Sequence, residues 1–159
     1  MQDRIERTIG ELDATIRDIR STIFSLTPAR NGTSVQEHIT ELIDSYAVNL
    51  GFSPVLLCDE AIDEVLTESS RLALLLVVRE ALSNVSRHAH ATSVMIAVAV
   101  EADRLVVVVT DDGVGLPDQV AESGLGNVRT RARQHGGSMD LLAHTPRGTV
   151  LRWQVPLHD

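Results

Sequence analysis

The sequence predicts a two-layer α/β sandwich with a mixed, mostly antiparallel sheet and three main helices, preceded by a long N-terminal helix. Along residues 94–100, β-branched side chains alternate with Met or Ala, and the continuously apolar, mostly β-branched run 105–109 follows, which predicts two adjacent strands. Residues 139–143 and 149–155 predict a closing hairpin. Helical segments precede these paired strands, which argues against a doubly wound parallel fold. With 43% of 159 residues apolar, the chain can bury one core of ordinary size.

An apolar seam runs along the first segment of the chain. Its members are spaced alternately four and three residues apart, which predicts one helix over residues 3–26 that packs along another helix. They are Ile5, Ile9, Leu12, Ile16, Ile19, Ile23 and Leu26. We expect three parts: residues 1–27 as the second helix of a dimerisation and phosphoacceptor hairpin, a linker at 28–34, and a globular domain at 35–159.

The globular domain is expected to open with a capped helix. Ser34 and Glu37 form a capping-box pattern, and the helix should end near Gly51. Residues 54–59 then predict a strand, 68–90 a long apolar helix, and 127–135 a third helix. The single cysteine, Cys58, lies in an apolar run, so we expect a buried structural thiol without a disulfide.

A polar stripe interrupts the apolar helix at 68–90. Glu80, Asn84, Arg87 and His88 share one face of an ideal helix. A solvated surface is the ordinary explanation for such a stripe. Here it is less attractive, because asparagine is a poor helix former and the flanking sequence is too apolar for a surface helix. The stripe therefore indicates the edge of a cavity.

Three further signals follow along the chain. Asp111 and Asp112 end a buried strand and precede Gly113 and Gly115, which would admit a flat ligand, although an ordinary Asp-Gly turn gives the same pattern. A Gly-x-Gly turn then opens a helix, and such a turn offers backbone N–H groups to a phosphate. The fourth signal is a Gly-Thr pair at the start of the last strand. Each signal is weak alone.

In this order and spacing, the four signals resemble the nucleotide-binding boxes of the GHKL ATPase superfamily, whose fold is the Bergerat-type ATP-binding fold. Residues 79–89 (REALSNVSRHA) resemble the form of the first box found in histidine kinases that partner NarL-type regulators. Residues 18–26 (DIRSTIFSL) resemble the second hairpin helix of the actinobacterial DevS/DosT dormancy sensors. The resemblance implies the ATP-binding catalytic domain of a two-component sensor histidine kinase.

The resemblance assigns one group of residues to the base. Asp111 would accept a hydrogen bond from the adenine amino group, and Thr149 would support it. Gly113 and Gly115 would shape the site, and His88 would lie near the adenine, where many relatives carry an aromatic ring.

A second group is assigned to the phosphates. Asn84 would coordinate Mg²⁺, and Arg87 would contact the phosphates. Glu80 would be catalytic, orienting the nucleophilic histidine or accepting its proton. Gly124 and Gly126 would let the connection between the glycine boxes close over ATP. That connection is short, and Asn127 stands where many relatives have another glycine.

The acceptor histidine of this family precedes an acidic residue on the first hairpin helix. His38, His88, His90, His135 and His144 lack that neighbour, and His158 is next to the end of the chain. We therefore expect the chain to bind ATP without completing its own phosphorelay. The implied partners are the phosphoacceptor hairpin of the same kinase, as a homodimer in the full-length protein, and a NarL/LuxR-type response regulator.

Composition excludes other classes of partner. The net charge of −8 repels nucleic acid and anionic lipid, and no apolar run approaches the roughly 20 residues of a membrane span. A cytoplasmic location is therefore expected. Two alternatives use the same boxes: an anti-sigma-factor serine kinase, and a nucleotide-gated module that controls dephosphorylation of a response regulator.

The heptad seam predicts weak self-association of the chain. Seven seam residues could pair two copies, but an isolated two-stranded coil of about three and a half heptads is marginal, since association itself costs several kcal/mol. Sedimentation equilibrium over a wide concentration range should show a largely monomeric protein. A dimer that persists at nanomolar concentration would contradict this prediction.

Overall fold

The computed structural model describes residues 4, 5, 8, 12, 15, 16, 19, 33–116 and 122–157. The chain divides into two compact units, Met1–Thr33 and Ser34–Asp159. All seven described residues of the first unit before Thr33 are helical, and its described seam residues are between 45% and 57% exposed: Ile5, Leu12, Ile16 and Ile19. The rest of the helix predicted over residues 3–26, and the linker residues 28–32, lie outside the described residues.

The second unit contains α2 (Val35–Leu50), β1 (Val55–Cys58), α3 (Ile62–Val65), α4 (Glu68–Asn84), the π-helical turn η1 (Val85–Ala89), β2 (Val94–Glu101), β3 (Arg104–Asp111), α5 (Glu122–Gln134), β4 (Ser138–Ala143) and β5 (Thr149–Pro156). The five strands form one sheet in the order β1-β2-β3-β5-β4. Only β1 and β2 pair in parallel, and the other described pairs are antiparallel.

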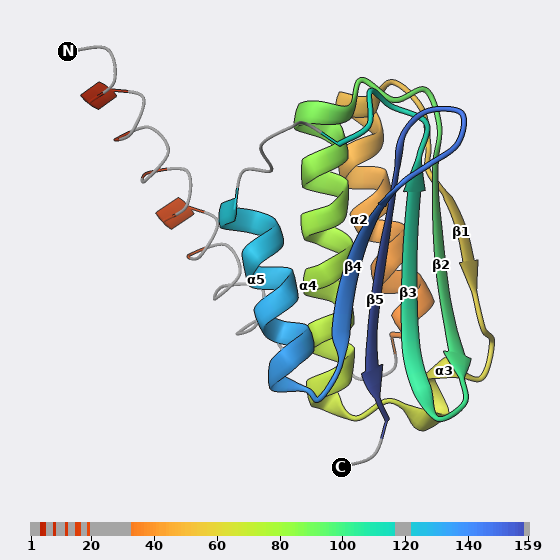
Figure 1. Ribbon diagram of the computed structural model, residues 1–159. Coiled ribbons are helices and arrows are strands. Elements are labelled where there is room, and N and C mark those ends of the chain that lie inside the picture. Colours follow the sequence, from red (N-terminus) through yellow and green to blue (C-terminus); the bar gives the residue numbers. More distant parts are fainter. Residues whose placement is uncertain are drawn as a thin grey trace. The chain divides into compact units, whose positions relative to one another are not determined.

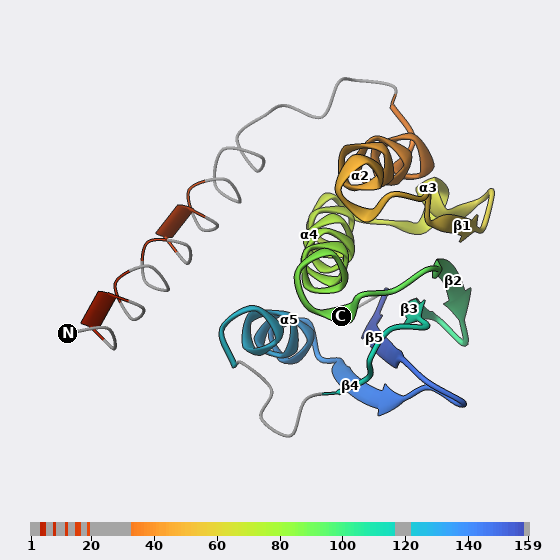
Figure 2. The same ribbon diagram turned by 90° about the horizontal axis from the view of Figure 1, so that it is seen from above.

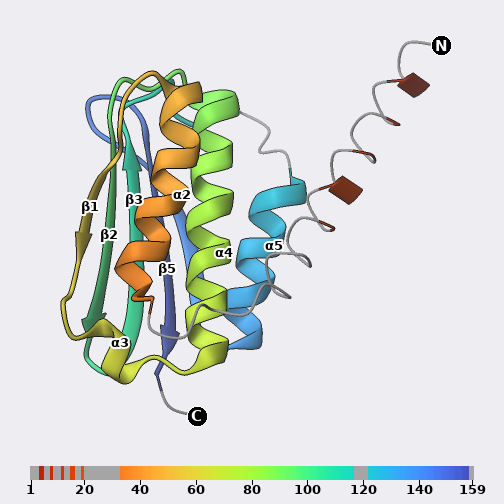
Figure 3. The ribbon, with the colours of Figure 1, turned by 180° about the vertical axis from the view of Figure 1, so that it is seen from behind.

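The sheet carries its helices on one face. Figure 1 shows α4 and α5 to the left of the strands and α2 behind them, and Figure 2 shows the two layers from above. The view from behind shows the same layering (Figure 3). The core between the layers includes fully buried Trp153, Leu82 and Ile96. The predicted two-layer α/β sandwich with a mixed, mostly antiparallel sheet is therefore confirmed.

Local sequence signals explain several of these elements. Ser34 accepts the N–H of Glu37, whose carboxylate accepts the N–H of Ser34, so the predicted capping box begins α2. Gly51 ends α2 with φ +80°. Ala102 and Asp103 connect β2 to β3 with positive φ angles of 46° and 61°, the backbone twist that suits a two-residue hairpin.

Three predictions about helices need correction. The helix predicted over residues 68–90 is α-helical only to Asn84, and η1 continues it as a π-turn. The third helix starts at Glu122 instead of Asn127, because its first turn packs Gly124 against Glu80 of α4. Packing of this kind outweighs the poor helix propensity of the two glycines in its first turns. The short helix α3 was not predicted.

The expectation of a buried thiol at Cys58 is wrong. The residue is half-buried, because β1 forms an edge of the sheet. Burial raises the pKa of the thiol, and the charges of Asp59 and Asp63 raise it further.

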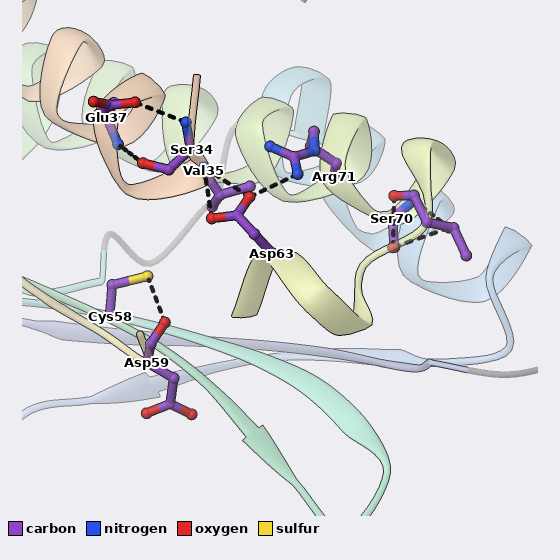
Figure 4. A network of polar contacts seen from close by, with 9 residues as sticks. Ser34, Val35, Glu37, Cys58, Asp59, Asp63, Ser70 and Arg71 are labelled. Carbon is purple, nitrogen blue, oxygen red and sulfur yellow. Dashed lines mark hydrogen bonds and ion pairs between the residues drawn. The ribbon is translucent and has the colours of Figure 1, made fainter. Parts of the chain in front are cut away.

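Asp63 on α3 joins helices α2 and α4 (Figure 4). Its carboxylate oxygens accept the N–H of Val35 at 3.0 and 3.2 Å and pair with Arg71 of α4 at 2.6 Å. Val35 is the first residue of α2, where backbone N–H groups have no partner within the helix and a negative charge is favourable. Asp63 therefore anchors the start of α2 to α4.

Among the described residues, no helix is both long and apolar enough to cross a membrane.

Replacing Asp63 should destabilise this unit. Asp63→Ala leaves the Val35 N–H and Arg71 without their acceptor, so the free energy of unfolding should fall by about 1–2 kcal/mol. Urea denaturation followed by far-UV circular dichroism measures the change. Glu64→Gln is the matched control, because Glu64 is the exposed neighbour on the same helix. Equal stability of Asp63→Ala and the wild type would show that the network does not anchor α2.

Candidate functional site

The polar and glycine signals of the sequence gather at one end of the sandwich, the upper end in Figure 1. There α4 passes into η1, β3 ends at Asp111, and β5 begins at Thr149. The N-terminal turn of α5 packs against α4 nearby, at Glu80. The structure thus brings together segments that lie up to about 70 residues apart in the sequence.

Asp111 is the buried carboxylate of this region, with 6% of its surface exposed. Its Oδ1 accepts the N–H of Gly113 at 2.8 Å. Burial raises the pKa of the Asp111 carboxyl, and the neighbouring charge of Asp112 adds to the rise. Backbone N–H groups of Gly113 and Thr149 and the charge of His144 oppose that rise. A buried carboxylate of this kind is poised to accept a hydrogen bond from a ligand.

Two glycines allow the backbone to close around Asp111. A Cβ on Gly113 would overlap the carbonyl oxygen of Ala89, and the next residue, Val114, donates its N–H to that oxygen at 2.8 Å. Gly148 has φ +115°, and a Cβ there would overlap the carbonyl oxygen of Asp111. These contacts attach η1 and the β4–β5 turn to the end of β3.

Glu80 and Asn84 lie one turn apart on α4, so they share a face. Each is partly exposed, yet each has a buried polar atom without a hydrogen-bond partner among the described residues: Oε1 of Glu80 and Nδ2 of Asn84. A Cβ on Gly124 would overlap the Glu80 carboxylate, so the first turn of α5 lies directly against it. Unpartnered buried polar atoms are costly, so these two groups are open to a partner such as a ligand or a water molecule.

The remaining predicted site residues are more open. Arg87 and His88 are exposed on η1, and Thr149 is half-buried. Gly126, in the second turn of α5, has open space around the position of a Cβ. The π-turn alters the register that an α-helix would give Arg87 and His88 relative to Glu80, so the predicted stripe does not continue in one straight line.

Sequence reasoning missed one residue here. Asp112 directs its carboxylate away from Asp111, to Thr92 and Ser93 before β2. Its position in the Asp-Asp-Gly sequence was the only available signal, and that signal does not reveal a partner 20 residues earlier.

No group of three or more His, Cys, Asp or Glu side chains suited to a metal occurs within the part of the chain that the structure describes. Magnesium bound with nucleotides needs no such group, because it uses one or two protein oxygens together with phosphate and water oxygens.

Comparisons with known proteins identify the fold and its relatives. A family model described as "Histidine kinase-, DNA gyrase B-, and HSP90-like ATPase" matches residues 69–159. The chain is 29% identical over 157 residues to the sensor histidine kinase LiaS of Bacillus subtilis, and the match covers 96% of this chain and 42% of LiaS. It is 31% identical over 163 residues to the sensor histidine kinase NarS of Mycobacterium tuberculosis, covering 98% of this chain and 37% of NarS. The nitrate/nitrite sensor protein NarX of Escherichia coli is 24% identical over 164 residues, covering 94% of this chain and 27% of NarX. The chain therefore spans less than half the length of each of these relatives.

Solved structures show the same fold. The histidine kinase domain of the Erythrobacter litoralis EL346 blue-light activated histidine kinase superposes with a TM-score of 0.72 at 17% identity, covering 91% of this chain and 75% of that one. The Acinetobacter baumannii histidine kinase AdeS superposes with a TM-score of 0.67 at 14% identity, covering 99% and 84%. At these identities the likeness concerns the fold alone, and it confirms the predicted architecture.

The raised pKa of Asp111 predicts how the free energy of unfolding depends on pH. A carboxyl with a higher pKa in the folded state binds protons more tightly when folded, so its contribution to stability falls as pH rises from the ordinary aspartate range through the raised pKa. Asp111→Asn removes this dependence and retains an oxygen acceptor for the Gly113 N–H. At neutral pH its free energy of unfolding should equal or exceed that of the wild type, with the difference shrinking towards acidic pH. Urea denaturation at several pH values tests this, and a variant that is less stable at neutral pH would contradict it.

Proposed function

The chain belongs to the histidine kinase-, DNA gyrase B- and HSP90-like ATPase family, as the ATP-binding catalytic domain of a NarX/LiaS-type sensor histidine kinase, and we propose that it transfers the γ-phosphoryl group of ATP to a histidine on a phosphoacceptor hairpin. The observation that carries this proposal is the buried Asp111 carboxylate at the end of β3, enclosed by glycine contacts. LiaS and NarS are sensor histidine kinases, which disfavours the anti-sigma-factor serine kinase alternative.

Asp111 recognises the base in this proposal. An ionised carboxylate accepts a hydrogen bond from the adenine amino group, whereas guanine presents a carbonyl oxygen at the same position and is repelled. Thr149 lies beside Asp111 in the β3–β5 pairing and supports the base. Gly113 and Gly115 keep side chains away from the plane of the adenine, and His88 lies on the neighbouring η1 turn.

Asn84 and Arg87 hold the phosphate end. The residues present fit a magnesium ion, because a half-turn of the Asn84 amide exchanges its buried, unpartnered nitrogen for a ligating oxygen. A magnesium ion held there by Asn84 would supply positive charge to neutralise charge that develops on the transferring phosphoryl group. Arg87 is exposed on η1 and free to reach the phosphates, with Gly126 leaving room at the start of α5.

Glu80 acts on the acceptor histidine. The attacking imidazole nitrogen forms a bond to the γ-phosphorus as the bond to the β-phosphate oxygen breaks, and the imidazole proton passes to the Glu80 carboxylate. Gly124 lies against the buried Oε1 of that carboxylate, while the Glu80 side chain as a whole stays partly exposed.

The proposed function also involves protein partners outside this chain. The exposed apolar residues of the first unit suit a helix that pairs with a hairpin partner in a homodimer, and a NarL/LuxR-type response regulator receives the phosphoryl group. Residues 18–26 support a DevS/DosT-like parent kinase.

Single-turnover phosphotransfer tests the proposed reaction. The chain is mixed with γ-labelled Mg-ATP and a separately produced hairpin that carries the acceptor histidine, and acid-labile, base-stable label on the hairpin is measured. Glu80→Gln should slow transfer at least about 100-fold with little change in ATP affinity. Glu68→Gln, an exposed change on the same helix, is the control. ATP binding without label on any acceptor hairpin would overturn the kinase assignment.

Base recognition by Asp111 predicts a loss of nucleotide selectivity. Asp111→Asn should weaken ATP binding about tenfold or more and abolish the preference for ATP over GTP, because an amide can also donate to the guanine carbonyl. Calorimetric titration with both nucleotides measures this. A folded variant with unchanged selectivity would remove Asp111 from the base site.

Magnesium ligation by Asn84 predicts a metal-dependent defect. Asn84→Ala should weaken ATP binding about tenfold with Mg²⁺ but less than about twofold in EDTA. Asn49→Ala, an exposed change on α2, is the control. Equal losses with and without metal would contradict the role.

A further inference from the structure

Asp112 makes three side-chain hydrogen bonds to the segment that precedes β2. Its Oδ1 accepts the N–H of Thr92 at 2.7 Å and the N–H of Ser93 at 2.9 Å. Its Oδ2 accepts the Thr92 hydroxyl at 2.6 Å. The Thr92 hydroxyl, followed by the backbone N–H groups, holds the pKa of the Asp112 carboxyl well below its ordinary range. The carboxylate is therefore ionised, and these bonds are charge-assisted, at any physiological pH.

The backbone of Asp112 extends the same connection. Its N–H donates to the carbonyl oxygen of Ser93 at 3.3 Å, and its carbonyl oxygen accepts the Nε–H of Arg147 at 3.1 Å. Arg147 belongs to the turn between β4 and β5. One residue thus joins the end of β3 to the segment after η1 and to the β4–β5 turn.

These three segments also enclose Asp111. The segment after η1 follows directly from Ala89, whose carbonyl oxygen contacts Gly113 and Val114. The β4–β5 turn carries Gly148, which lies against the backbone of Asp111. Any loosening of the bonds at Asp112 would allow the walls around the neighbouring carboxylate to shift.

We propose that Asp112 is a positioning residue, which holds the base-recognising carboxylate of Asp111 in place through its bonds to Thr92, Ser93 and Arg147. This role rests on the proposed function of Asp111 in base recognition. In this role Asp112 itself does not contact the nucleotide. Its effect on recognition is exerted through the backbone that it shares with Asp111.

The negative charge of Asp112 has a second effect, which can be tested independently of its hydrogen bonds. This charge contributes to the raised pKa of Asp111, whereas the charge of His144 on the β4–β5 turn lowers that pKa. Removing the charge of Asp112 should lower the pKa of Asp111. Removing only the Thr92 hydroxyl leaves that charge in place.

Two variants test the inference through nucleotide selectivity. Thr92→Val keeps the shape and the backbone N–H but loses the hydroxyl donor. We expect its ATP affinity to fall about three- to tenfold and its GTP affinity to change less than about twofold, so that the ATP-to-GTP ratio falls. Asp112→Asn should lower the ratio as well, and it should also move the acid limit of ATP binding to lower pH. Thr92→Val should leave that limit unmoved. Asp44→Asn, which removes one exposed charge on α2, should change neither quantity.

The results distinguish the inference from the proposed function. An unchanged ATP-to-GTP ratio in Thr92→Val and Asp112→Asn, alongside a lost preference in Asp111→Asn, overturns the positioning role alone. Equal losses for ATP and GTP also overturn it, because general loosening of the fold predicts that pattern. An unchanged ratio in Asp111→Asn instead overturns the role of Asp111 and, with it, the basis of the inference.

Discussion

The close approach of three backbone segments at the end of β3 determines the geometry of the candidate site. Gly113 lies against the carbonyl oxygen of Ala89, and Gly148 lies against that of Asp111, so a side chain at either glycine would force the segments apart. Burial of Asp111 depends on both contacts. Because the folded backbone already encloses the carboxylate, the base recognition proposed for Asp111 would not require its surroundings to be organised first, which would preserve binding energy.

Much of the fold could be predicted from local pattern, because the interactions that specify it are local. The alternation along β2 and the Ser34–Glu37 capping box act over a few residues, and both are present in the structure. Asp111 was recognisable as a candidate because four signals, each weak alone, occur in the order and spacing of the GHKL nucleotide-binding boxes. The long helix at the N-terminus rests on a heptad pattern, and it stays a prediction over most of its length.

The features that escaped prediction depend on tertiary contacts. The first turn of α5 incorporates Gly124 because it packs against Glu80, a partner 44 residues away that no local propensity reveals. Edge exposure of Cys58 follows from strand order, which its apolar neighbours do not specify. The partners of Asp112 lie about 20 and 35 residues away, and its role emerges only when those segments meet.

We propose that ATP binds where β3 ends, between η1 and the β4–β5 turn. Amide NMR spectra recorded during titration with a non-hydrolysable Mg-ATP analogue test this most directly, since each residue reports separately. We predict large shifts for Gly113, Val114 and Thr149, with small shifts for Leu57 and Leu142 on the uncovered face of the sheet. Shifts concentrated on that uncovered face, or no shifts at millimolar nucleotide, would contradict ATP binding at the end of β3.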